Sequence, residues 1–528
     1  MASRGWLRQV RAVASPHVRI SAVIAALLAV FSTTTCNGNE GTNPRQVTGP
    51  AVTDVVFTTE PPATVEGNVV INPPIQVATR DASGAPVPTA TVTIIVGTSP
   101  WPAPGSRVLG TVTVKAVNGV ATFDNLRVDK PGAGYTLTAL SGAASHSSTV
   151  FNVKLTFTTL AAAGSHTCGV TIGGAYCWGW NRYGELGGAT GANPLDSVPV
   201  LVANTVPFLQ IAGGEDHTCA LSLGGTVYCW GENSQGELGD GTTSGSDPCP
   251  GGASMVDRCR LTPAPVTGSG TPPVILRSLT SGFLDLHTCG LVTGGIAYCW
   301  GYNYAGELGD GTTTNRPAPV QVMGSGTEPL VLTSLASGGS QTCGVATDQA
   351  VYCWGFGSSS TPTQIAGSGA SPLLFTSVTP GLHTCGLTTD GAVYCWGVNV
   401  HGELGDGTTT SGNTPVRVLG SGTAPLVFTM ISAGDFHTCG VTAAGSAYCW
   451  GWDGYGQLGD GATTDQTTPV QVLGSGTAPL LFASVTGGEA YTCGLTHTGA
   501  AYCWGYNELA SLGDGTRTSH STPIRVIQ

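Results

Sequence analysis

One pattern recurs seven times along this chain: a Cys, a second Cys nine or ten positions later, and then Trp-Gly. A unit of about 50 residues that recurs in this way predicts an array of similar small units, each packed on its neighbours. The seven pairs are Cys168 and Cys177, Cys219 and Cys229, Cys289 and Cys299, Cys343 and Cys353, Cys385 and Cys395, Cys439 and Cys449, and Cys493 and Cys503.

The fifth repeat shows what one unit can build. Short apolar and β-branched runs near 373–378, 383–388, 392–397 and 415–418 predict four antiparallel strands, the content of one propeller blade. A three-residue turn ending at Gly391 places Cys385 directly opposite Cys395, within disulfide distance. The first pair is one residue closer, so its turn should be Ile172-Gly173 alone. Seven units predict a closed ring, in which the terminal strand 523–526 completes the first blade.

Cysteine usage indicates the compartment. The chain has 17 Cys and no Cys-x-x-Cys knuckle of the kind that holds zinc. Cys249 and Cys259 form an eighth local pair within an insertion at 242–265, which is interpreted equally well as a contact element or as tolerated decoration. Sixteen paired Cys predict disulfides in an oxidising, extracytoplasmic setting. The remaining Cys is Cys36.

Residues 1–36 have the form of an export signal. Four Arg precede an apolar run from Ile20 to Phe31, which is too short to span a bilayer but suits a signal core. The segment ending at Cys36 resembles a bacterial lipoprotein signal, and this resemblance implies lipidation of Cys36. Plain cleavage nearby is the alternative. Both alternatives predict export. The protein would be a lipoprotein at the cell surface or outer membrane, or it would be secreted. Residues 37–52 are polar and predict a linker.

Residues 53–153 contain no Cys, and this segment is predicted to form a separate module. Alternating apolar runs and the hairpin dipeptide Asn118-Gly119 predict about seven strands, which fits a β-sandwich. The segments 81–87 and 118–123 resemble bacterial immunoglobulin-like repeats, which implies a spacer; an adhesive face is the alternative. The predicted fold is therefore all-β, with an N-terminal immunoglobulin-like β-sandwich and a seven-bladed β-propeller at 155–528.

The repeat also resembles a known family. From Ala212 to Gly241 the chain contains Ala-Gly-Gly-Glu-Asp-His-Thr-Cys and later Tyr-Cys-Trp-Gly-Glu-Asn-Ser-Gln-Gly-Glu-Leu-Gly-Asp-Gly, which is similar to the repeat of the regulator of chromosome condensation family. The resemblance covers about 155–528 and implies a seven-bladed propeller. In the nuclear member the propeller promotes nucleotide exchange on a small GTPase and binds chromatin. Some secreted bacterial members inhibit β-lactamases with one propeller face. The fourth unit, from Trp354, lacks the Asn and the Gly-Glu-Leu-Gly-Asp loop.

Charge and motifs exclude several function classes. A net charge of −12 with only three Lys disfavours binding to nucleic acid. No nucleophile elbow, zinc-protease motif or phosphate loop occurs, so no catalytic residue, cofactor or metal is predicted. The His residues before Thr-Cys (His166, His217, His287, His383 and His437) and the Asp residues of the Gly-Asp-Gly turns (Asp240, Asp310, Asp406, Asp460 and Asp514) are interpreted as structural rather than metal-binding.

Aromatic residues break the symmetry of the repeats. They follow the Trp-Gly dipeptides, in loops that a propeller would place on one rim. Trp and Tyr dominate binding hot spots, so these residues are the candidate binding site, although packing between blades is the alternative. They are Trp180, Tyr183, Tyr302, Tyr304, Phe356, Trp452, Tyr455 and Tyr506.

The sequence thus predicts an exported, monomeric, non-enzymatic binding or scaffold protein. Its partner would be a protein or a glycan, and its membrane contact would be limited to a lipid anchor. The alternatives are a guanine-nucleotide exchange factor-like regulator of a GTPase, which follows from the resemblance, and an extracellular hydrolase or lyase.

Overall fold

The computed structural model describes residues 50–101, 106–188, 193–204, 206–251, 258–267, 274–282, 286–324, 329–366, 372–420, 425–474 and 479–527. The predicted export signal 1–36, with Cys36, and most of the predicted linker 37–52 lie outside these residues. Every regular element within the described ranges is a β-strand, so the all-β class is confirmed. No helix in these ranges has the length and apolar character that a membrane crossing requires.

The first strands form two main sheets over a common core. One sheet has the order β1-β3-β7, and the other has the order β2-β11-β9-β4-β6 with β10 paired to β9. Ile75, Val92 and Tyr135 are fully buried between them. Asn118 and Gly119 both have positive φ, as the hairpin dipeptide requires. An immunoglobulin-like identity for this module stays a prediction. Its strands are β1 (Asp54–Thr59), β2 (Thr64–Glu66), β3 (Ile75–Arg80), β4 (Thr91–Thr98), β5 (Val108–Leu109), β6 (Thr113–Lys115), β7 (Val120–Phe123), β8 (Arg127–Val128), β9 (Gly132–Ser141), β10 (Ala144–Ser147) and β11 (Phe151–Lys154).

Seven antiparallel sheets follow in the described part of the chain, each built from consecutive strands. The first three are β12 (Phe157–Ala162), β13 (His166–Thr171), β14 (Gly174–Trp180) and β15 (Leu195–Leu201); β16 (Phe208–Gly213), β17 (His217–Ser222), β18 (Val227–Gly231) and β20 (Arg258–Pro265) with β19 (Asp247–Pro248); and β21 (Leu276–Ser281), β22 (His287–Val292), β23 (Ala297–Gly301) and β24 (Arg316–Gln321).

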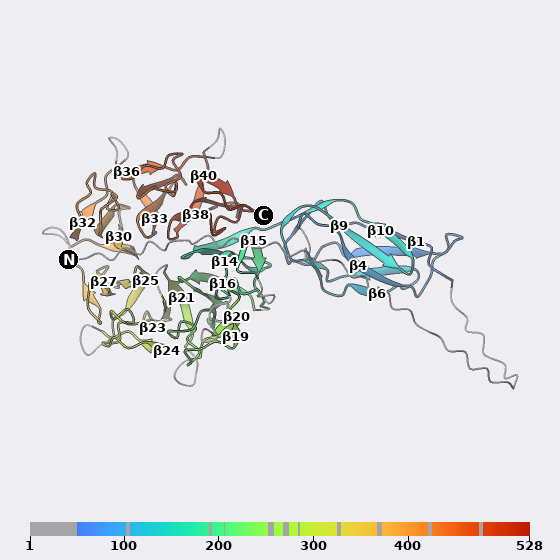
Figure 1. The fold of residues 1–528 in the computed structure, drawn as a ribbon, viewed down its shortest axis with the longest axis horizontal. Coiled ribbons are helices and arrows are strands. Elements are labelled where there is room, and N and C mark those ends of the chain that lie inside the picture. The colour runs from blue at the N-terminus through green and yellow to red at the C-terminus, as the bar shows by residue number, and fades with distance from the viewer. Residues whose placement is uncertain are drawn as a thin grey trace, which may run out of the picture. The chain divides into compact units, whose positions relative to one another are not determined.

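The remaining four sheets repeat this plan. They are β25 (Leu332–Gly338), β26 (Gln341–Ala346), β27 (Val351–Gly355) and β28 (Thr363–Gln364); β29 (Phe375–Pro380), β30 (His383–Thr388), β31 (Val393–Gly397) and β32 (Gly412–Arg417); β33 (Phe428–Ala433), β34 (His437–Thr442), β35 (Ala447–Gly451) and β36 (Gln466–Gln471); and β37 (Phe482–Gly487), β38 (Tyr491–Thr496), β39 (Ala501–Gly505) and β40 (His520–Arg525). The first strands, such as β16, β25 and β33, lie nearest the middle of the array in Figure 1, whereas fourth strands such as β24 and β36 lie outside.

The predicted hairpin register is confirmed. Cys385 pairs directly with Cys395 in the ladder, and their Cα atoms are 4.1 Å apart across a disulfide. The turn in the first sheet contains only Ile172 and Gly173, because Thr171 pairs with Gly174. All eight predicted pairs form disulfides, including Cys249–Cys259 in the insertion.

The predicted closure by strand exchange is wrong. The terminal strand β40 pairs with β39 of its own sheet, and the outer edge of β14 is already paired with β15. The first and last sheets instead meet through side chains. Phe157 and Trp178 of the first sheet share a core with Cys503 and Leu512 of the last.

A circle of hydrogen bonds links the sheets near their inner edges. The Nε2 atom of His166 lies 2.8 Å from the Thr218 hydroxyl of the next sheet, and His217 contacts Thr288 in the same way. His287, His383 and His437 repeat this contact, and Gln341 replaces His in the fourth sheet by accepting from Thr384. At the last sheet the Thr167 hydroxyl donates to Tyr491 across 3.0 Å, which closes the circle. The histidines are therefore structural links, as interpreted from the sequence.

Candidate binding face

Two kinds of loop lie at the same end of each sheet. One is the tight turn between the first and second strands, and the other is the longer loop after the third strand. Backbone hydrogen bonds join them: Trp452 N–H donates to Phe436 O across 2.7 Å, and Tyr506 N–H donates to Ala490 O across 3.0 Å. The residue after each Trp-Gly is therefore held beside the tight turn, so both loops contribute to one rim.

The longer loop is rigid because its polar residues satisfy one another. In the third sheet the Asn303 side-chain amide donates to Asp310 and to the carbonyls of Thr312 and Thr314. Arg316 pairs with Asp310 at 2.7 Å. These contacts support the turn-stabilising interpretation of the Gly-Asp-Gly aspartates. No group of three or more His, Cys, Asp or Glu in the described residues is placed to hold a metal ion.

Buried carboxyls complete these loops. Glu237 accepts from Gln235 N–H, while its second oxygen has no hydrogen-bond partner in the described structure. Burial raises the pKa of Glu237 to about 8. The sixth sheet has the neutral amide Gln457 in the equivalent place, accepting from Tyr455 N–H. The loop therefore needs a hydrogen-bond acceptor here and does not need a charge.

Five aromatic rings from three adjacent sheets meet on this rim, and we call them the rim cluster: His401, Phe436, Trp452, Tyr455 and Tyr506. The centroid of the Trp452 ring lies 5.5 Å from that of Tyr455 and 5.9 Å from that of Phe436. Tyr455 and Tyr506 lie 4.8 Å apart, and His401 packs against Trp452 at 6.0 Å. Most of these pairs meet edge to face, so the rings form walls of different orientation.

The other predicted aromatic residues lie elsewhere on the rim. Tyr302 and Tyr304 stack on each other with centroids 5.7 Å apart, and Tyr304 is 75% exposed. Phe356 is 65% exposed. Trp180 is half-buried, and Tyr183 has the Arg182 guanidinium 5.5 Å above its ring. The structure thus gathers Trp452, Tyr455 and Tyr506 but does not bring all eight candidates together.

Sequence reasoning missed two members of the rim cluster. Phe436 lies in a tight turn between strands, and His401 follows Val400 in a longer loop. His401 Nδ1 lies 2.7 Å from the Asp465 carboxylate of the next sheet. The sequence carried a signal for both residues, because the equivalent positions of the other repeats hold different residues. The same variation had identified the eight candidate aromatic residues. Phe436 was missed because it does not follow a Trp-Gly dipeptide. His401 was missed because only Trp, Tyr and Phe were selected among the residues that do.

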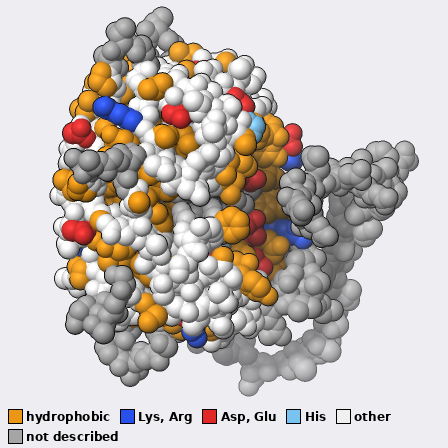
Figure 2. All heavy atoms as spheres, turned by 90° about the vertical axis from the view of Figure 1, so that its left-hand side faces the viewer, with side chains coloured by type: hydrophobic (Ala, Val, Ile, Leu, Met, Phe, Trp, Pro, Cys, Tyr) orange, Lys and Arg blue, Asp and Glu red, His pale blue; other side chains and the backbone are white. Residues whose placement is uncertain are grey.

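Acidic side chains lie beside the rim cluster. Asp435, next to Phe436, is 3% exposed, and its Oδ1 atom has no hydrogen-bond partner in the described structure. Burial raises its pKa well above the usual range, and the charges of Glu489 and Glu215 raise it further. These two glutamates come from the corresponding turns of other sheets. On the face in Figure 2, hydrophobic and acidic side chains are exposed together at the right, with a Lys or Arg side chain beside them.

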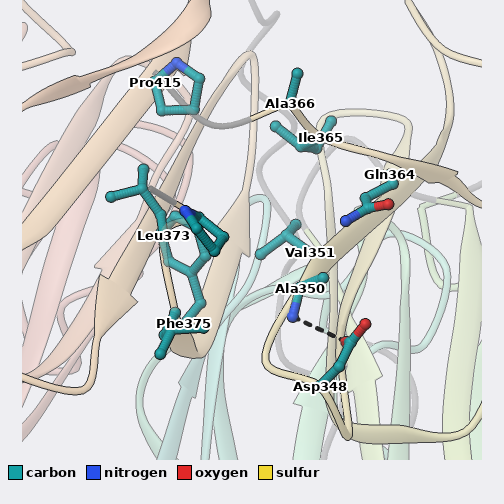
Figure 3. Close-up of a pocket in the computed structure, with 11 residues that line it drawn as sticks. Asp348, Ala350, Val351, Gln364, Ile365, Ala366, Leu373, Phe375 and Pro415 are labelled. Atoms are coloured by element: carbon teal, nitrogen blue, oxygen red, sulfur yellow. Dashed lines mark hydrogen bonds between the residues drawn. The ribbon is translucent and has the colours of Figure 1, made fainter. Parts of the chain in front are cut away.

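A separate pocket lies where the fourth sheet is incomplete. Its outer strand β28 has only two residues, which leaves a cavity of about 260 Å³ beside the fifth sheet. Val351, Ile365 and Leu373 line it with Asp348 at one end, as Figure 3 shows. The missing Gly-Glu-Leu-Gly-Asp loop of this repeat accounts for the short strand.

The sheets and their loops define a propeller built from repeats of one type. The pattern of the regulator of chromosome condensation (RCC1) repeat matches residues 173–221, 294–345, 390–441 and 444–495, and a second pattern of the same description matches 208–237 and 429–457. The chain therefore carries RCC1 repeats folded as an RCC1-like propeller. Prp20p from Saccharomyces cerevisiae has a similar structure, with a TM-score of 0.56 and 21% identity over 71% of this chain and 87% of that chain.

Two curated relatives are similar in sequence. The ultraviolet-B receptor UVR8 of Arabidopsis thaliana is 26% identical over 369 residues, which are 70% of this chain and 69% of that protein. The E3 ubiquitin-protein ligase HERC2 of Homo sapiens is 27% identical over 388 residues. Those residues are 69% of this chain but 7% of the ligase.

The prediction that this protein is not an enzyme is contradicted by these relatives, because they include the ligase HERC2. The prediction was based on the lack of catalytic motifs. The matched repeats occupy a small part of the ligase, so a motif search confined to such repeats cannot exclude an enzyme.

Proposed function

We propose that this chain is an exported or cell-surface binding protein that holds a protein partner against its rim cluster. In this proposal the seven sheets are the blades of a seven-bladed propeller, and an immunoglobulin-like sandwich spaces it from a lipid anchor at Cys36. The observation that carries the proposal is the convergence of Phe436, Trp452, Tyr455 and Tyr506 on one rim.

Two features support this function. Aromatic side chains supply large contact areas at low entropic cost, and a rigid scaffold lowers the cost of ordering them further. The scaffold here is rigid because each blade sheet contains a disulfide and hydrogen bonds join neighbouring sheets. A protein partner also agrees with the similar fold of Prp20p, which binds Gsp1p and histones.

Export is supported by the eight disulfides and by the N-terminal apolar run. A fractionation experiment tests it directly. The full chain and its Cys36→Ala variant are expressed in a Gram-negative bacterium. We expect the parent in the membrane fraction with oxidised thiols and the variant released from it. Recovery of the parent in the cytosol with free thiols would refute export.

Capture of partners by the purified chain tests the binding face. We expect a specific partner to be captured by the parent and lost with Trp452→Ala or Tyr455→Ala. Leu223→Ala is the matched control, because Leu223 is 67% exposed in the turn at the opposite end of the strands. Unchanged capture by both rim variants, with melting temperatures like that of the parent, would remove the proposed face. Regulation of a GTPase, the alternative prediction, is tested by nucleotide release from candidate GTPases.

A further inference from the structure

The chemistry around the rim cluster indicates what kind of partner surface fits it. Trp452 and Tyr455 meet at 83°, and Tyr455 and Tyr506 meet at 60°. At such angles one ring of each pair turns its edge toward the other ring. Tyr455 is 43% exposed, so part of its surface is open to solvent. The faces of aromatic rings carry negative potential and attract cations, most strongly for Trp.

Acidic side chains lie beside the Tyr506 end of the cluster, where the Tyr506 hydroxyl donates to the Glu508 carboxylate across 3.3 Å. Burial raises the pKa of Tyr506 to about 12, and Glu508, Tyr455 and Glu489 each add to the rise. Glu489 is solvent-exposed, and its charge also acts on Asp435. Asp435 precedes Phe436 in the chain and Glu489 precedes Ala490, whose carbonyl accepts from Tyr506 N–H, so these acids lie at the Phe436 and Tyr506 ends of the cluster. A cation beside the rings would be attracted to the carboxylates of Glu489 and Glu508.

Two basic side chains near this face have contacts of their own. His401, the one basic side chain in the rim cluster, pairs with Asp465 at 2.7 Å. Arg517 donates through Nε to the backbone carbonyl of Glu508. The whole chain carries a net charge of −12, so long-range attraction also favours a basic partner.

We infer that the rim cluster and the acids beside it recognise a basic segment of the partner, with an arginine or lysine side chain over the aromatic faces. Arginine fits better than lysine, because its planar guanidinium stacks on rings and is more weakly hydrated. This inference rests on the proposed function, since it names the chemistry of the partner for the same face.

Binding of short labelled peptides to the full chain tests the inference. The probes are tetra-arginine, tetra-lysine, tetra-glutamine and tetra-glutamate, measured by fluorescence anisotropy at about 0.15 M salt. We expect tetra-arginine to bind more tightly than tetra-lysine, and the glutamine and glutamate peptides not to bind. Trp452→Leu should weaken tetra-arginine binding about tenfold while keeping the charge. Glu489→Gln should weaken it several-fold while keeping the rings.

Matched controls separate a site from general attraction to an acidic protein. Asp348→Asn removes one exposed charge from a turn at the opposite end of the strands, and Leu223→Ala removes an exposed apolar side chain there. Both should change affinity less than twofold. Equal effects of Asp348→Asn and Glu489→Gln, or no effect of Trp452→Leu, would overturn the inference. If a captured partner depends on Trp452 while tetra-arginine does not bind, the inference fails and the proposed function stands. If neither depends on Trp452, both fail.

Discussion

At the scale of single residues, Asp453 is the clearest departure from the repeat. Its counterpart Asn303 donates its side-chain amide to Asp310 and to two carbonyls. Asp453 is fully buried, and its Oδ2 atom has no hydrogen-bond partner in the described structure. Burial raises its pKa to about 7, and the charges of Asp460 and Asp465 add to the rise. The sixth loop therefore contains a carboxyl that favours the protonated form.

Replacing this carboxyl by an amide should stabilise the chain. A group whose pKa is raised on folding contributes most below its unfolded pKa, near 4, and that contribution is lost as the pH rises toward 7. We expect Asp453→Asn to raise the free energy of unfolding by about 1–3 kcal/mol at pH 8 and by less at pH 4.5. Urea titrations at both pH values measure this. The reverse change Asn303→Asp should destabilise more at pH 8, and an equal effect of Asp453→Asn at both pH values would contradict the assigned protonation.

At the scale of elements, the hairpin is the part of the fold that local sequence determines. Gly391 at the turn and the spacing of Cys385 and Cys395 are enough to set the register, because a short turn fixes which residues face each other. The same argument identified the shorter turn at Ile172-Gly173. The short strand β28 was not predicted, although its repeat was seen to lack the loop that precedes the fourth strand in other repeats.

Contacts between sheets could not be predicted from the local sequence. His401 meets Trp452 and Tyr455 meets Tyr506 only after separate sheets have packed together, and periodicity carries no information about such non-local pairs. The same limit explains the wrong closure. The pattern around 523–526 identified a strand but not its partner, and β39 was the nearer edge.

The disulfide between two central strands of a sheet should stabilise the chain more than the disulfide in the insertion. Cys385 and Cys395 are fully buried between two central strands, whereas Cys249 and Cys259 join the margin of the second sheet. We expect the double variant Cys385→Ala/Cys395→Ala to lose about 2–3 kcal/mol from loop entropy, and more from lost packing. The double variant Cys249→Ala/Cys259→Ala is the control, because the disulfide that it removes closes a loop of equal length. Thermal melting should show the larger loss for the first variant; equal losses would show that a disulfide between central strands contributes no more than one at the margin of a sheet.

At the scale of the whole array, closure depends on side chains at one seam. The β12–β15 and β37–β40 sheets are not joined by a strand shared between them. Tyr491 holds their inner edges together: its hydroxyl accepts from Ala163 N–H and Thr167, and donates to His166 O across 2.6 Å. It stands where most repeats have His, and the longer phenol reaches the backbone of the first sheet as well as its Thr.

Removing this one hydroxyl should loosen the seam selectively. Tyr491→Phe keeps the ring, which is 1% exposed, and leaves the buried Ala163 N–H and Thr167 hydroxyl without this acceptor. The loss costs about 0.5–1.5 kcal/mol, because Ala163 N–H still reaches His166 O and the Thr167 hydroxyl still reaches Ser511 O. Because only this seam lacks a covalent connection between adjacent sheets, we expect hydrogen exchange in β12 and β38 to accelerate by several-fold up to about tenfold, while β29 and β30 stay protected. Tyr506→Phe on the rim is the control and should leave all four strands unchanged. Uniform acceleration around the array would show that the seam is no weaker than the others and that closure is shared by every pair of sheets.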